Sequence, residues 1–120
     1  MAFVAWLALI SGVGIVGLWT MLIATGQVPE IEERDRAIWF HITAEYLLGF
    51  ALISSGLLLL LIGADVSIRV FAGAALGGTA YSTINSSGYY ARKDQWVAVG
   101  AFGALTVFVV VALAILILGG

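Results

Sequence analysis

The sequence predicts an all-α polytopic membrane protein, with a single membrane domain over residues 1–120 that forms a four-transmembrane-helix antiparallel bundle. Hydrophobic residues make up 62% of the chain, and its mean hydropathy is +1.13. Only 10% of the residues are charged, whereas soluble domains carry about 25%. A soluble chain of 120 residues could not bury that much apolar surface. We therefore expect a multi-pass protein of the cell membrane.

Three short polar segments divide the chain into four apolar stretches. They read TGQVPEIEERDRA (25–37), GADVS (63–67) and ARKDQ (91–95). The stretches between them predict transmembrane helices at approximately 2–25, 37–63, 67–90 and 95–118. Each is long enough for a bilayer core, which needs about 20 residues. Because the loops are short, consecutive helices are expected to run antiparallel.

Two further local features concern the start of the first apolar stretch and the start of the third predicted helix. No basic residue precedes the first apolar stretch, which is longer than the roughly 7–15 residues of a signal-peptide core. We therefore expect it to be a retained transmembrane helix. In the second loop, Asp65 or Ser67 is available to cap the following helix.

The distribution of lysine and arginine predicts the orientation in the membrane. The first and third loops carry Arg34, Arg36, Arg92 and Lys93, whereas the other side has only Arg69. Cytoplasmic loops are enriched in these residues, while acidic residues contribute little to the rule. Both termini are therefore expected outside the cell. The acidic residues of the first loop are interpreted as a solvated segment or, alternatively, as a vestibule that attracts cations.

The only histidine of the chain, His41, lies four residues before Glu45 in the second predicted helix. At 100° per residue, both share an arc of about 80° with the glycines of that helix. Small residues mark close helix contacts in membranes, and a charge in hydrocarbon costs at least about 2.5 kcal/mol. The pair is therefore expected to face the interior of the bundle.

Polar residues of the other helices are expected at the same depth. Folding the second and third predicted helices about their turn brings Glu45 between Tyr81 and Asn85. We predict a cytoplasm-facing pocket for ligand binding or proton transfer, formed by His41, Glu45, Tyr81 and Asn85. Three further residues are expected at its margin: Thr20, Thr83 and Tyr89.

Three interpretations of the His41–Glu45 pair stay open. Residues at positions i and i+4 of a helix can contact each other, so the pair could simply be satisfied by neighbours and stabilise the bundle. The pair could instead exchange protons, as intramembrane ionisable residues often do. Finally, His41 and Glu45 could supply two ligands to zinc or iron, but the chain has no second histidine and no cysteine. We therefore expect neither a metal nor a cofactor.

The segment HITAE, which carries His41 and Glu45, is similar to the His and Glu pair of the emopamil-binding sterol isomerase family. In that family the two residues shuttle a proton and stabilise a carbocation inside a helical bundle. The resemblance covers these two residues, and the further acid of that family has no counterpart here. Four spans in a short chain also resemble small multidrug-resistance transporters and fluoride channels. The first-helix glutamate of the former and the glycine-rich Asn and Arg motif of the latter do not occur here.

The main functional hypothesis is proton-coupled binding or translocation of a small solute or ion, with Glu45 titrating and His41 as its partner. One alternative is an accessory or scaffold subunit of a membrane complex. Another is a membrane enzyme that transfers protons on a lipid-like substrate, so catalysis is left open. The expected partners are membrane lipid, a small molecule or ion, and either further copies of the chain or another membrane subunit. Nucleic acid is not expected, because the net charge is −2 and no basic cluster occurs.

Overall fold

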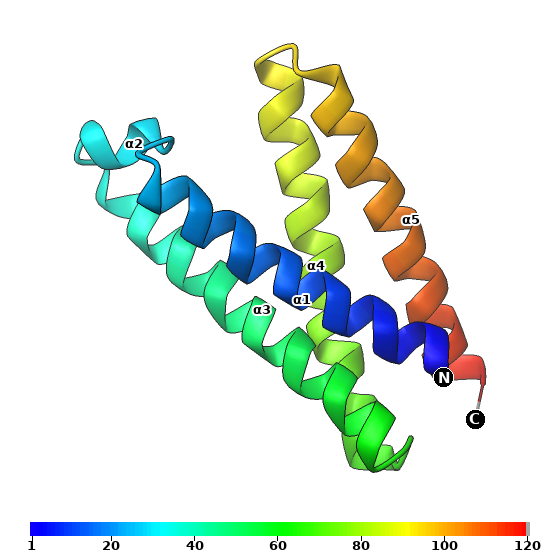
Figure 1. The fold of residues 1–120 in the computed structure, drawn as a ribbon. Coiled ribbons are helices and arrows are strands. Elements are labelled where there is room, and N and C mark those ends of the chain that lie inside the picture. The colour runs from blue at the N-terminus through cyan, green and yellow to red at the C-terminus, as the bar shows by residue number, and fades with distance from the viewer. Residues whose placement is uncertain (120) are drawn as a thin grey trace.

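The computed structural model describes residues 1–119, which form helices and turns with no strand among them. Its four long helices are α1 (Ala2–Ala24), α3 (Arg36–Leu61), α4 (Val66–Arg92) and α5 (Trp96–Leu118) (Figure 1). Their ends lie within about two residues of the predicted stretches, a normal spread for helix termini. A fifth helix, the single turn α2 (Pro29–Glu32), was not predicted. Pro29 begins it, at the position where a missing N–H is tolerated.

Three of the helices, α1, α3 and α5, are long and apolar enough to cross a membrane, which indicates a multi-pass membrane protein. Helix α4 has 27 residues and is therefore also long enough. It is less apolar than the other three, because it carries many serine, threonine and glycine residues and an asparagine. That α4 also crosses the membrane therefore stays a prediction.

The long helices form two hairpins, α1 with α3 and α4 with α5 (Figure 1). The hairpins lie close together near the two termini and diverge toward α2 and the α4–α5 turn. At the α3–α4 turn, Gly63 has φ +120°, a conformation that glycine tolerates. The Asp65 carboxylate then accepts a 3.0 Å hydrogen bond from the Ile68 amide and caps α4. Of the two predicted caps, the structure uses Asp65.

The hydrophobic core lies at the end where the hairpins meet. Its fully buried residues come from all four long helices: Val4, Ala8, Leu52, Ala72, Leu76, Val109 and Ala112. Many of these are alanine, which lets helix backbones approach closely. The tightest contact joins α1 and α3, where a Cβ on Gly12 would lie 2.6 Å from the Gly49 carbonyl oxygen. Dense packing at one end leaves the divergent ends of the hairpins to form a cavity.

Candidate ligand-binding site

A cavity of about 370 Å³ is lined by residues of both hairpins, near their divergent ends. Every helix contributes to its wall. Apolar residues form much of the lining: Ile15, Leu18, Leu22, Val28, Pro29, Ala37, Ile38, Phe102 and Leu105. Among the polar lining residues are Gln27, Glu30, Asp35, His41, Glu45, Ser82, Thr83, Asn85, Ser86, Tyr89 and Tyr90. Cavities of about this volume are typical of small-molecule sites.

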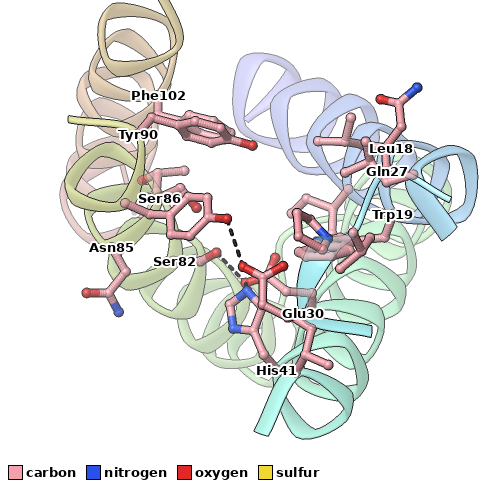
Figure 2. Close-up of a pocket in the computed structure, with 18 of the residues that line it drawn as sticks. Leu18, Trp19, Gln27, Glu30, His41, Ser82, Asn85, Ser86, Tyr90 and Phe102 are labelled. Atoms are coloured by element: carbon pink, nitrogen blue, oxygen red, sulfur yellow. Dashed lines mark hydrogen bonds and ion pairs between the residues drawn. The ribbon is translucent and has the colours of Figure 1, made fainter. Parts of the chain in front are cut away.

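Glu45 is the buried acid of this cavity. It is only 8% exposed, although it carries a carboxylate. The Ser82 hydroxyl donates a 2.6 Å hydrogen bond to Glu45 Oε1, which links α3 to α4 (Figure 2). Within residues 1–119, Ser82 is the only hydrogen-bond donor to this carboxylate. The second oxygen, Oε2, is therefore available to a ligand or a proton.

His41 lies one turn nearer the open end of the cavity than Glu45. Its Nε2 is 4.0 Å from Glu45 Oε1, and its side chain is half-exposed. The Trp19 ring of α1 contacts it edge-on, with 5.5 Å between ring centroids. The predicted i, i+4 contact between His41 and Glu45 is thus present, at a distance longer than a hydrogen bond. The geometry brings an imidazole and a carboxylate to one cavity wall.

A chain of hydrogen bonds joins the two hairpins at the cavity mouth. The Tyr89 hydroxyl of α4 donates to Glu30 Oε1 of α2 over 2.9 Å, and Lys93 Nζ donates to the Tyr89 oxygen over 2.6 Å. We call Glu30, Tyr89 and Lys93 the mouth clasp. Hydrogen bonds from its backbone amide and from Tyr89 lower the pKa of Glu30. The hydrogen bond to Tyr89 raises the pKa of Lys93. Both shifts favour the charged forms that the mouth clasp requires.

The aromatic residues of α4 and α5 form the wall opposite Trp19. Tyr90 stacks on Phe102 with 5.5 Å between centroids and 8° between ring planes. Figure 2 shows this stacked pair on one side of the cavity and Trp19 on the other. Below the stack, the Thr83 and Thr106 hydroxyls share a 2.6 Å hydrogen bond. The α4–α5 wall is therefore held by both stacking and a polar contact.

The structure places five of the seven predicted site residues in the cavity lining: His41, Glu45, Thr83, Asn85 and Tyr89. Tyr81 does not belong to the lining and is 73% exposed, so the expected contact between Tyr81 and Glu45 is wrong. Ser82, the next residue along α4, takes that position because one residue rotates the side chain by about 100°. Thr20 also lies outside the lining and contacts the Tyr46 hydroxyl at 2.7 Å.

Several lining residues were not predicted. Two of them, Ser82 and Ser86, lie on α4. The sequence does carry a signal for them, because together with Asn85 and Tyr89 they have the i, i+3, i+4, i+7 spacing of one helix face. Glu30 and Asp35 lie in the loop that was interpreted as solvated or as a vestibule, and both line the cavity. Trp19 carries no comparable signal, because its helix is apolar on all sides.

The lining also bears on the possible metal site. Within residues 1–119, no group of three His, Cys, Asp or Glu side chains could hold a metal ion. His41 and Glu45 line the cavity together with Glu30 and Asp35, but among the described residues no three of these side chains form such a group. This geometry is unlike that of known structural or catalytic zinc sites, which use at least three protein ligands.

Comparison with known proteins places the chain in a family. No curated protein and no solved structure matches it. A family model for a domain of unknown function, DUF8058, matches residues 1–119. This match covers almost the whole chain, so the protein belongs to the DUF8058 domain family.

Proposed function

We propose that the protein binds a small solute or ion in the cavity between its hairpins and moves it across the membrane with proton coupling. Glu45 is the titrating group in this proposal, and His41 is its partner. The observation that carries it is the 8% exposure of Glu45 at a cavity wall. A buried carboxylate in a membrane protein is costly unless a proton or a cation neutralises it. The same carboxylate can therefore bind either a proton or a cationic ligand.

The proposal includes a topology. All four long helices cross the membrane as an antiparallel bundle, with both termini outside the cell and the cavity mouth toward the cytoplasm. The loops at the mouth end carry Arg34, Arg92 and Lys93, which favours this orientation. Helix α4 can cross despite its polarity because its Ser82 and Ser86 side chains are half-buried and line the cavity.

Proteoliposomes that contain a pH-sensitive dye would test the transport step. We expect outward gradients of sodium, potassium or small ammonium ions to drive proton movement in at least one case. Glu45→Gln keeps the side-chain volume but cannot titrate, so the flux should fall to the level of empty liposomes. Glu33→Gln is the matched control, because Glu33 is exposed and outside the lining. Equal fluxes for Glu45→Gln and the native chain would contradict the proposal.

Proton transfer on a lipid-like substrate is a second candidate function. It is favoured by the 4.0 Å contact of His41 with Glu45 beside apolar walls and by the HITAE resemblance. This function predicts a lipid-like molecule in the cavity of the purified protein, detectable by mass spectrometry after extraction. His41→Gln should then abolish its conversion, whereas a continuous aqueous path through the protein would argue against an enzyme.

A further inference from the structure

We propose that the cavity takes an amphipathic cation, in which an ammonium group is joined to a small apolar or aromatic body. This inference rests on the proposed function, since it names the chemical class of the ligand for the same site. Three independent features of the cavity lead to it: the sign of its charges, the free oxygen of its buried acid and its aromatic walls.

The charges of the lining are almost all negative. Glu30, Asp35 and Glu45 contribute carboxylates, and none of the lining residues is a lysine or an arginine. The Lys93 ammonium lies at the mouth, where it is bound to the Tyr89 hydroxyl. Among the lining residues, His41 alone has a basic side chain. An anionic ligand would therefore meet repulsion, whereas a cation would be attracted.

The depth of Glu45 provides an anchor for that cation. Glu45 as a whole is only 8% exposed, and only Oε1 receives a hydrogen bond within the residues that the structure describes. Asp35 differs, because its carboxylate already caps α3 by accepting from the Ala37 amide. Glu45 thus has one carboxylate oxygen without a donor at the inner part of the cavity. An ammonium group would neutralise the buried charge there.

The walls match the rest of such a ligand. Trp19 lies on one side, and the stacked Tyr90 and Phe102 rings lie on the other (Figure 2). Aromatic faces attract ammonium groups and also pack against apolar bodies. Within residues 1–119, no group of three His, Cys, Asp or Glu side chains could hold a metal ion. The combination favours an organic cation over an inorganic one.

Equilibrium binding to the full chain in nanodiscs would test this inference. The probe is phenyltrimethylammonium, and its controls are tert-butylbenzene, which has the same shape without charge, and benzenesulfonate, which is anionic. In nanodiscs of an uncharged glycolipid, we expect the cation to bind about tenfold more tightly than the neutral isostere. The anion should not bind. Values from empty nanodiscs are subtracted, because the neutral probe partitions into lipid.

Two variants and one control substitution test whether the cation binds in this cavity. Glu45→Gln should weaken cation binding about tenfold, whereas Glu33→Gln should leave it unchanged. Trp19→Leu keeps every carboxylate and should weaken cation binding severalfold, which keeps the test valid if Glu45→Gln does not fold. Equal binding of the cation and the neutral isostere, or cation binding that neither variant reduces, would overturn the inference.

The lipid composition distinguishes two sources of the ammonium group. If phosphatidylcholine nanodiscs suppress probe binding, the ligand is a lipid headgroup; unchanged binding indicates a free solute. The outcome is also separable from that of the transport proposal. Charge-selective binding without proton flux would leave this inference standing and remove transport. Glu45-dependent proton flux without charge-selective binding would leave the transport proposal standing and overturn this inference.

Discussion

The Glu45 carboxylate depends on a single serine for its position. Ser82 donates a 2.6 Å hydrogen bond to it across the boundary between the two hairpins. Hydrogen bonds between membrane helices contribute about 0.6 kcal/mol on average and up to about 1.7 kcal/mol. One hydroxyl therefore contributes both to the orientation of the acid and to the contact between hairpins.

Ser82→Ala should lower the free energy of unfolding by about 1–2 kcal/mol, because the buried acid loses its donor. Tyr81→Phe is the control from the adjacent position, where the side chain is 73% exposed; it should change stability by less than about 0.5 kcal/mol. Reversible unfolding in mixed micelles, followed by circular dichroism, measures both. Equal effects of the two substitutions would show that Ser82 is not the partner of Glu45.

At the scale of the helices, the α1–α3 hairpin rests on backbone contact. A Cβ on Gly12 would lie 2.6 Å from the Gly49 carbonyl oxygen, and a Cβ on Gly56 would lie 2.7 Å from the Ala5 carbonyl oxygen. Real Cβ atoms do not approach backbone so closely, so the helices would have to separate. Gly14, on the same helix as Gly12, has open space around it. The two glycines therefore have different roles despite lying two residues apart.

Gly12→Ala should destabilise the hairpin by about 1–3 kcal/mol, since the methyl group overpacks the contact. Gly14→Ala should be neutral or stabilise by up to about 1 kcal/mol through helix propensity. The same unfolding experiment compares them, and helical content of the folded state should be equal in both variants. A Gly12→Ala protein as stable as Gly14→Ala would contradict the close contact.

For the whole molecule, the mouth clasp is the contact that ties the divergent ends of the hairpins. Tyr89 lies at its centre, accepting from Lys93 and donating to Glu30. Tyr89→Phe removes both hydrogen bonds without removing the ring. We expect the hairpin ends to separate further or to vary more in distance. The chain has no cysteine, so spin labels on Glu33→Cys and Gln95→Cys report that distance by pulsed electron resonance.

The pH dependence of the mouth clasp follows from its two shifted groups. Glu30 has a lowered pKa, so its contribution is complete above the ordinary glutamate value and is lost as the pH falls through the lowered value. Lys93 has a raised pKa, so its contribution is complete below the ordinary lysine value and is lost as the pH rises through the raised one. The label distance should therefore stay constant between about pH 5 and pH 9. It should broaden in stronger acid or base, and Tyr89→Phe should abolish this dependence.

The local sequence is sufficient to predict the apolar character of the chain, the bounds of the long helices and the co-facial placement of His41 with Glu45. These properties follow from local composition and from the fixed 100° rotation of each helical residue. It also predicts that Asn85, Thr83 and Tyr89 lie near the depth of Glu45, because a short turn fixes the depth of one helix against the next.

Packing between the helices determines that α4 meets the cavity with Ser82 rather than with Tyr81. The rotation of α4 about its axis is set by packing at the opposite end of the molecule, among Ala72, Leu76, Val109 and their neighbours. That rotation turns Ser82 toward Glu45 and Tyr81 outward. The same packing leaves the hairpins divergent, so that Glu30 and Trp19 reach a common cavity from separate segments. Contacts between residues so distant along the chain depend on how whole helices fit together, which periodicity does not encode.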